Sequence, residues 1–225
     1  MRFTVADDAR TKLSGLSIGH ILFSEVKNGK SHKAVDAELE IISTAARARF
    51  KTTEEISADE TLKAVRAIFS AAGTDPTKDR PSGEALMRRI IRGEGIYRIN
   101  DVVDLNNLVS LETGFPCGVY DAANLSGEEM IFGIGKTGEG YESIGGKRVN
   151  AEARIISNDA QGIFGSPVAD SKRTAVGTST TTILMLIYAP KAVGDDQLKA
   201  AISRAIAFFT AITKAKKAEG GIFEI

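Results

Sequence analysis

The sequence contains no Trp, one Cys and two His among its 225 residues. The single thiol, Cys117, excludes an intramolecular disulfide, and its isolation is typical of proteins in a reducing compartment. The histidines and the cysteine show no metal-ligand spacing. We therefore expect neither a metal site nor a cofactor. Pro is scarce as well, at 5 residues, which argues against long linkers.

Neither sign of charge is in excess. Lys plus Arg and Asp plus Glu number 29 each, so the formal net charge is zero. A neutral chain does not attract nucleic acid over its whole surface, so we expect no DNA binding, and any RNA contact must come from a local patch. Long apolar runs are missing too. The longest, residues 183–189, is far too short to cross a membrane, and the N-terminal segment lacks the apolar stretch of a signal peptide. We expect a cytoplasmic protein that does not contact a membrane.

What is present is a series of helical patterns, then strand patterns, then a helix. An early apolar run at 16–26 predicts a buried strand, and 182–188 predicts a central one after several short strands from 128 onward. This order favours an α+β fold with a mixed β core, sandwich- or barrel-like, flanked by helices in one domain, 1–225. The predicted helices are 33–50, one capped by Ser57 and ending at Gly73, one capped by Ser82 and ending near Gly93, 101–113, and 195–217.

The stretch GIGKTGEG, residues 133–140, contains the Gly-Lys-Thr of a phosphate-binding loop. Such a loop also needs a glycine where Met130 stands, and a helix after the triplet, so we interpret the stretch as a turn. No G-x-S-x-G elbow and no Ser-His-Asp set is present. A hydrolase with this sequence would not use an obvious side-chain nucleophile.

The helix at 101–113 is apolar over most of its circumference, which indicates burial. One wedge differs, because Asn106, Asn107 and Ser110 gather there beside Val103. A buried amide without a partner costs about 1–3 kcal/mol, so these groups need partners. They bond the neighbouring backbone, or they line a pocket and bond a polar ligand. Composition alone favours the first interpretation.

A second polar cluster, residues 165–182, holds eight Ser or Thr hydroxyls and runs directly into the central strand. Hydroxyls and glycine amides at the mouth of a strand can bind carbonyls, carboxylates or phosphates. The simpler interpretation is a long loop rich in turn-forming residues. The ligand-binding candidates in this cluster are Gly165, Ser166, Asp170, Ser171, Thr174 and Thr180.

Basic residues are bunched before the 101–113 helix. Most such charges are simply solvated, but a local group of guanidinium ions is also what an RNA backbone requires. The candidates for RNA contact are Arg88, Arg89, Arg92 and Arg98.

The segment RINDVVDLNNLVSLETGFPCGVYD, residues 98–121, resembles a motif of the tRNA-binding and editing domain of the bacterial phenylalanyl-tRNA synthetase beta subunit. That family has N-x-V-V-D-x-x-N on a helix, then L-E-x-G-x-P, then an aromatic-Asp pair. SPVADSKRTAVGTSTTTILMLIYAP, residues 166–190, is similar to the family's glycine-and-acid loop and the strand after it. The resemblance places a family-like core at about 76–190, with an N-terminal helical part at 1–75 and the helix at 195–217 packed on it. The whole chain also looks like small stand-alone proteins built around this domain.

The resemblance implies an α+β domain that hydrolyses tyrosine wrongly attached to phenylalanine tRNA, by orienting a water at the ester. It implies that Asn107, Pro116 and the 165–166 region line the amino-acid pocket. Two departures change the expectation. Gly118 stands where the family has a histidine that positions the reacting end, and Leu186 stands where it has the glutamate that binds the tyrosine hydroxyl. We therefore expect a different or less polar amino acid.

Two hypotheses follow. The first is a stand-alone editing protein that binds tRNA or aminoacyl-tRNA and hydrolyses a mischarged one in trans, as an aminoacyl-tRNA deacylase. Its catalytic residues are unknown, although Asp170 or Asp159 could orient water. The second is a non-catalytic module that binds a small amino-acid-like ligand, and the missing histidine favours it. A scaffold that only binds a protein partner is the simplest alternative.

Overall fold

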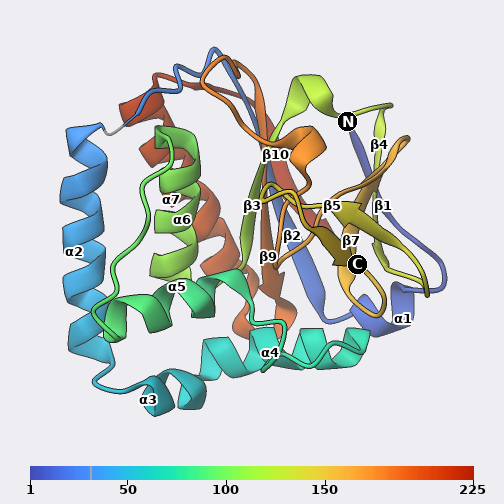
Figure 1. Cartoon of the computed structure of the whole chain (residues 1–225), viewed down its shortest axis with the longest axis horizontal. Helices are drawn as coiled ribbons and strands as arrows, with labels where there is room; N and C mark the ends of the chain where they lie inside the picture. Colours follow the sequence, from blue (N-terminus) through green and yellow to red (C-terminus); the bar gives the residue numbers. More distant parts are fainter. Residues whose placement is uncertain (31) are drawn as a thin grey trace.

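The computed structural model describes residues 1–30 and 32–225, with the side chains at 217 and 218 left out. It has three layers: a group of helices, a four-stranded sheet, and a second four-stranded sheet (Figure 1). The helices are α1 (Arg10–Leu13), α2 (Lys33–Arg49), α3 (Thr53–Ala58), α4 (Glu60–Ala72), α5 (Ser82–Ile91), α6 (Asp101–Thr113) and α7 (Asp195–Thr213). Short 3-10 turns occur at η1 (Ala122–Asn124), η2 (Lys172–Thr174) and η3 (Lys191–Val193). This architecture confirms the α+β class.

The first sheet has the strand order β10-β2-β9-β3 and the second has the order β1-β4-β7-β8. A separate two-stranded ribbon pairs β5 with β6. The strands of the first sheet are β2 (Leu16–Ser24), β3 (Cys117–Asp121), β9 (Ile183–Pro190) and β10 (Lys216–Glu224). The remaining strands are β1 (Arg2–Val5), β4 (Glu129–Ile134), β5 (Gly140–Glu142), β6 (Arg148–Asn150), β7 (Ile155–Asp159) and β8 (Gly162–Gly165).

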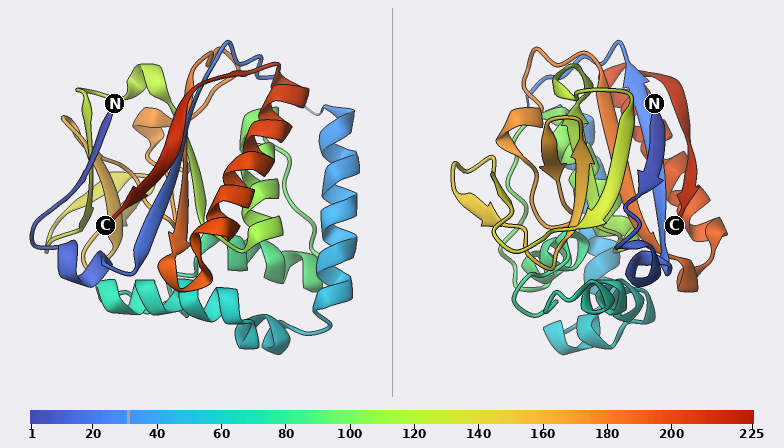
Figure 2. Two further views of the ribbon diagram at one scale, coloured as in Figure 1. Left: turned by 180° about the vertical axis from the view of Figure 1, so that it is seen from behind. Right: turned by 90° about the vertical axis from the view of Figure 1, so that its right-hand side faces the viewer.

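The first sheet lies between the helices and the second sheet, as the left view in Figure 2 shows. Helices α6 and α7 cover one face of it, and α4 runs across its lower end in Figure 1 and contacts β9. On the other side Phe132 of β4 packs against Tyr188 of β9 and Phe223 of β10. Every residue of β9 is buried, because both faces of this strand are covered. A strand buried on both faces reads as a continuous apolar run, and the sequence prediction of a central strand is confirmed.

Helix α6 has the bounds predicted for it. The Asn100 side chain caps its N-terminus by accepting from the Val103 amide at 2.9 Å. Gly114 ends it with a φ of +77°, a left-handed conformation that glycine adopts without strain. Both signals are local in the sequence, which is why the prediction succeeded.

The two serine caps were predicted wrongly. Ser57 lies inside α3, and α4 is instead capped by Asp59, whose carboxylate accepts from the Leu62 amide at 3.2 Å. Ser82 is the first residue of α5 rather than its cap, which is Pro81. Its buried hydroxyl has no hydrogen-bond partner among the described residues.

The prediction of a final helix over 195–217 was also wrong at its end. Helix α7 stops at Thr213, and Lys214 takes a φ of +60°. Strand β10 then pairs antiparallel with β2. The N-terminal part, 1–75, contains the strand predicted at 16–26, which is β2, and also β1, besides its helices. Across the described residues, no helix combines the length and the apolar character needed to span a bilayer.

Candidate functional site

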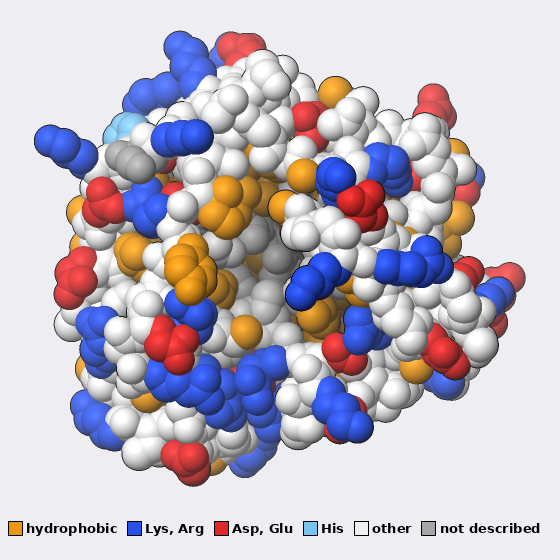
Figure 3. Space-filling model, in the orientation of Figure 1, with side chains coloured by type: hydrophobic (Ala, Val, Ile, Leu, Met, Phe, Trp, Pro, Cys, Tyr) orange, Lys and Arg blue, Asp and Glu red, His pale blue; other side chains and the backbone are white. Residues whose placement is uncertain are grey.

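One face of the molecule is hollowed between its helical part and its strands (Figure 3). A cavity of about 230 Å³ lies there, between α6, the edge strand β3 and the segment after β8. Much of its wall is apolar and comes from Ile99, Val103, Cys117, Val119, Ile144 and Val176. Its polar members are Ser82, Asn106, Asn107, Ser166 and Asp170. An apolar cavity with a few converging polar groups is the usual form of a small-molecule site.

The amides of α6 differ in their partners. Asn106 is buried, and its Nδ2 donates to the Cys117 carbonyl at 3.4 Å. That bond fixes the orientation of the amide, and its Oδ1 has no hydrogen-bond partner among the described residues. Asn107 is half-buried and also lines the cavity. Ser110 does not line the cavity, and its hydroxyl donates to the Phe115 carbonyl at 2.7 Å. For Ser110, the interpretation that the polar groups of this helix bond the neighbouring backbone therefore applies.

Asp170 brings a half-buried carboxyl to the same cavity. Burial raises the pKa of this carboxyl to about 7, against a smaller opposite effect of the Tyr120 hydroxyl. No Lys or Arg in the described part of the chain forms an ion pair with it or lowers its pKa. An unpaired carboxylate in low dielectric is costly. A ligand that supplies a cation or a donor would offset this cost, and no cation among the described residues competes for Asp170.

Three tyrosine hydroxyls surround this carboxyl from three different strands. Tyr141 shares a hydrogen bond of 2.9 Å with Ser166, and Tyr188 shares one of 2.8 Å with Ser157. The Tyr120 hydroxyl is buried and forms no hydrogen bond of regular geometry with a described residue, but it lies close enough to Asp170 and Tyr188 to lower the pKa of each. Burial raises the pKa of all three phenols, which are therefore neutral and can only act as hydrogen-bonding dipoles.

The Tyr120 ring occupies the space above two glycines. A Cβ placed on Gly165 would lie 2.5 Å from the Tyr120 ring, and one placed on Gly118 would overlap the Tyr120 hydroxyl. Tyr120 also meets Phe164 edge-on, with 4.8 Å between ring centroids. Gly165 therefore makes room for an aromatic ring and is not among the residues that line the cavity.

Pro116, Ser171, Thr174 and Thr180 do not line the cavity either. The three hydroxyls are used within the fold. Ser171 caps η2, Thr174 donates to a backbone carbonyl of β8, and Thr180 donates to the Asp121 carboxylate at 2.6 Å. Among the predicted ligand-binding residues, Asn106, Asn107, Ser166 and Asp170 thus lie together at the cavity. The hydroxyls of Ser110, Ser171, Thr174 and Thr180 form hydrogen bonds within the fold.

Two further groups are poor candidates for hydrolytic chemistry. Asp159 forms an ion pair of 2.9 Å with Arg173 and accepts from the backbone amides of Ser126 and Gln161. Its oxygens are used, and it does not line the cavity. Burial raises the pKa of the Cys117 thiol, so this sulfur stays protonated and is a weak nucleophile. Within the described residues, no cluster of three or more His, Cys, Asp or Glu could hold a metal ion.

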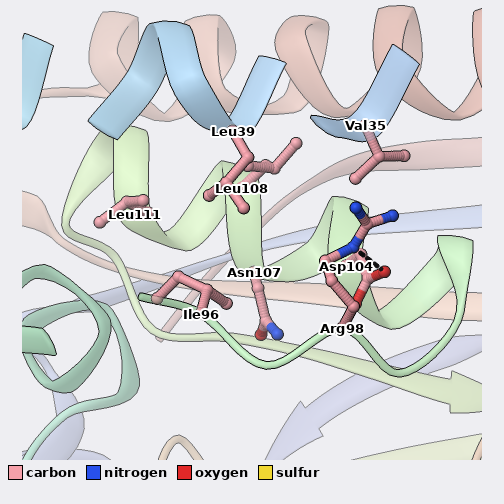
Figure 4. Close-up of a pocket in the computed structure, with 8 residues that line it drawn as sticks. All are labelled: Val35, Leu39, Ile96, Arg98, Asp104, Asn107, Leu108 and Leu111. Carbon is pink, nitrogen blue, oxygen red and sulfur yellow. Dashed lines mark hydrogen bonds and ion pairs between the residues drawn. The ribbon is translucent and has the colours of Figure 1, made fainter. Parts of the chain in front are cut away.

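Asn107 also borders a much smaller recess between α2 and α6, shown in Figure 4. Its other walls are mainly apolar, from Val35, Leu39, Leu108 and Leu111. The amide of Asn107 points away from Val35 and Leu39 (Figure 4). The recess measures about 10 Å³, no more than the room for one water, so it is not a ligand site.

The four arginines predicted to contact RNA all have carboxylate partners. Arg88 contacts Glu84, Arg89 and Arg92 contact Glu94, and Arg98 contacts Asp36 and Asp104. The side chains of Arg88 and Arg98 are 11% and 21% exposed, whereas that of Arg92 is 51% exposed. The segment after α5 runs beside α6 up to its N-terminus (Figure 1).

Sequence reasoning missed the tyrosine cluster and most of the apolar wall. Tyr120, Tyr141 and Tyr188 lie on strands far apart in the sequence, so no local motif joins them. A usable signal was present, because a buried tyrosine hydroxyl requires a polar partner. Ser82 was singled out only as a cap, and its place in the cavity was not predicted.

The model of the B3/4 domain family matches residues 64–213, which is most of the chain. The phenylalanine–tRNA ligase beta subunit of Nocardia farcinica is 28% identical over 166 residues, 73% of this chain and 19% of that subunit. The same subunit from Symbiobacterium thermophilum is 36% identical over 72 residues, 32% of this chain and 8% of that subunit. The chain thus spans less than a fifth of either relative.

Among solved structures, an N-terminal fragment of the phenylalanyl-tRNA synthetase beta subunit from Pyrococcus horikoshii has a TM-score of 0.49 and 11% sequence identity. The structural alignment covers 98% of this chain and 50% of that fragment.

Proposed function

The chain belongs to the B3/4 domain family, and from this premise we propose that it binds the aminoacyl end of a tRNA and hydrolyses a mischarged ester. Its relatives carry such a domain within the beta subunit of phenylalanine–tRNA ligase. The cavity between α6 and the 166–170 segment would hold the amino acid. The proposal includes action in trans, on tRNA released by a synthetase.

The observation that carries this proposal is the cavity itself. Its volume of about 230 Å³ suits a single amino acid, since pockets for larger ligands measure about 300–1,000 Å³. Asn106 and Asn107 offer amide groups to the polar part of the ligand. Hydrolysis would use a bound water, because the thiol of Cys117 is protonated and, among the described residues, no His lines the cavity to activate the hydroxyl of Ser82 or Ser166.

Specificity for tyrosine is not part of the proposal. Leu186 is fully buried in β9, and no residue of β9 lines the cavity. A site that selects a hydroxyl needs a hydrogen-bonding group for it, and the family's glutamate is replaced by Leu186. The apolar wall supports an uncharged, less polar side chain, such as that of an aliphatic amino acid or phenylalanine.

Contact with the tRNA end would come from the surface next to the cavity. Tyr97 is 74% exposed, and the Arg89 guanidinium lies 4.4 Å from its ring centroid. Ile99, two residues on, lines the cavity and is 56% exposed. An exposed aromatic ring beside a cation is a common platform for stacking a nucleic-acid base. We propose that Tyr97 stacks the terminal base while Arg89 and Arg92 face phosphates.

The deciding experiment is a deacylation assay on tRNAs charged with valine, leucine, phenylalanine and tyrosine. We expect hydrolysis of at least one less polar ester, and little of the tyrosyl ester. Asn106→Ala and Asn107→Ala should each lower the rate about tenfold or more, the effect of losing a buried hydrogen bond of about 1–3 kcal/mol. Asn124→Ala, an exposed asparagine on η1, is the matched control.

The second candidate is a binding module without turnover, and the absence of a positioning imidazole at Gly118 favours it. In that case no tRNA would be deacylated above the spontaneous rate, while a free amino acid would raise the melting temperature through binding to the native state. Absence of both effects would contradict the amino-acid site altogether. Cytoplasmic location and a single domain over 1–225 stay predictions.

A further inference from the structure

The cavity presents hydrogen-bond acceptors that the protein leaves without a full set of donors. The Asn106 Oδ1 atom is buried and unpartnered in the described structure, and its Nδ2 is already used by the Cys117 carbonyl. The half-buried Asp170 carboxyl has the Tyr120 hydroxyl as a neighbouring donor, but it forms no ion pair with any described Lys or Arg. Buried acceptors without donors are rare in native proteins and call for an explanation. A ligand rich in donors supplies one.

The charge of the cavity also favours a ligand rich in donors. All other cavity residues are uncharged side chains, so an ionised Asp170 gives the site a net negative charge. The cations nearest in sequence are used elsewhere, since Lys172 pairs with Glu142 and Arg173 pairs with Asp159. A carboxylate in such surroundings favours a compact cation with several N–H donors.

We propose that Asp170 binds the α-ammonium group of the aminoacyl ligand, with Asn106 Oδ1 as a second acceptor, and so selects esters whose amino group is free. This inference rests on the proposed function, because it takes the cavity as the aminoacyl site. It assigns Asp170 to recognition and not to activation of water. N-blocked amino acids and ligands that lack an amino group are excluded from the substrate class.

A metal ion fits this site less well. Among the described residues Asp170 has no acidic, His or Cys neighbours that complete a ligand set. An ammonium group needs only a few acceptors at hydrogen-bond distance, which one carboxylate and one amide oxygen provide. The apolar wall formed by Val103, Val119 and Ile144 is left for an uncharged side chain.

The surroundings of Asp170 set the pH dependence of this recognition. The titratable groups that face it are Tyr120 from β3, Tyr141 from β5, Tyr188 from β9 and Cys117 at the start of β3, all neutral at pH 7. Burial raises the Asp170 pKa to about 7, and an α-amino group has a pKa of about 8. Affinity therefore rises as pH increases to about 7 and falls again above about 8.

The test uses stable mimics of the ester in calorimetric titrations of the full chain. The probes are L-leucinamide and L-phenylalaninamide, each compared with its N-acetyl derivative. We expect the free amines to bind at least about tenfold more tightly than the acetylated forms, with a maximum near pH 7–8. Asp170→Asn should remove this preference, and Asp196→Asn, a fully exposed acid on α7, should retain it.

Each contrary outcome has a distinct meaning. Equal binding of free and acetylated amides overturns the ammonium assignment but leaves the aminoacyl site in place. Unchanged amine binding in Asp170→Asn, with slower tRNA deacylation, also overturns it and assigns Asp170 to the water. If no amide binds, the inference fails, and the deacylation assay still decides the proposed function. The amine comparison needs no variant, so it stands even if Asp170→Asn does not fold.

Discussion

Asp170 lowers the stability of the folded protein at neutral pH. Its folded pKa of about 7 lies above the usual value for an unfolded chain, about 3.9. Below about pH 4 both states are protonated and the carboxyl costs nothing. As pH rises to about 7, the unfolded state loses its proton first, so the free energy of unfolding falls, and above pH 7 the loss is constant.

Asp170→Asn should therefore stabilise the protein at pH 8 relative to wild type, by about 1–3 kcal/mol, and have little effect near pH 4. The full difference in pKa between the folded and unfolded states would correspond to a larger free energy, but solvent in the cavity screens the carboxylate and reduces the effect. Urea unfolding at several pH values measures the difference. Asp196→Asn is the control and should follow the wild-type curve. An Asp170→Asn difference that does not change with pH would show that this carboxyl titrates normally.

At the level of single residues, the candidate site was predictable from the sequence only in part. Asn106, Asn107 and Ser110 share one side of a helix, so periodicity grouped them correctly. It could not separate Ser110, because its acceptor, the Phe115 carbonyl, is placed by the turn after Gly114. Likewise the hydroxyls of Thr174 and Thr180 are no different in sequence from that of Ser166, and only tertiary neighbours assign them.

Among the elements, α5 and the segment that follows it carry the proposed tRNA contact. Arg89 and Arg92 share the single carboxylate of Glu94, so one positive charge remains in excess there. Arg88 is instead bound to the fully buried Glu84, together with Arg66. Arg88 also donates to the Ser57 hydroxyl of α3 at 2.6 Å, so it links α5 to α3, and its substitution would report on folding.

The double variant Arg89→Ala/Arg92→Ala should weaken tRNA binding and reduce the slope of log affinity against log salt by about 1–2. The physical reason is the loss of phosphate contacts and of the counterions that they release. Gel shifts at several salt concentrations provide the measurement. Lys12→Ala/Lys199→Ala removes two exposed charges from α1 and α7 and is the matched control. An equal loss in both variants would indicate a nonspecific charge effect and contradict the assignment.

Elements with local signals were predictable, and elements that depend on distant pairing were not. Helix α6 has its cap and its stop within the segment itself. Strand β10 has two consecutive glycines, 220 and 221, and the residues before them are Lys, Ala and Glu, which are poor strand formers. It becomes a strand because β2, almost two hundred residues earlier, offers an edge for it, as in the pair Lys216↔Ser24.

For the whole molecule, β10 closes one edge of the first sheet. Without it, β2 would expose a long apolar edge, with Ile18, Ile21 and Phe23 in its sequence. Exposed apolar edge strands promote association between chains. The C-terminal strand therefore protects the fold although it contributes nothing to the cavity.

A chain truncated after Ala215 should be less stable and should aggregate at concentrations where the full chain is monodisperse. Light scattering during heating, with circular dichroism, measures both effects. Glu224→Ala changes an exposed charge at the end of the same strand and should behave as wild type. A truncated chain that stays monodisperse with an unchanged melting temperature would contradict this role of β10.

The position of Tyr120 over Gly118 and Gly165 has a consequence for protein engineering. A histidine does not fit at Gly118 while Tyr120 keeps its position, because its Cβ would overlap the Tyr120 hydroxyl. The exchange becomes sterically feasible only if Tyr120 is shortened in the same variant. Positions 118 and 120 are thus epistatic. A variant with a side chain at position 118 requires a smaller residue at position 120, introduced in the same step or before it.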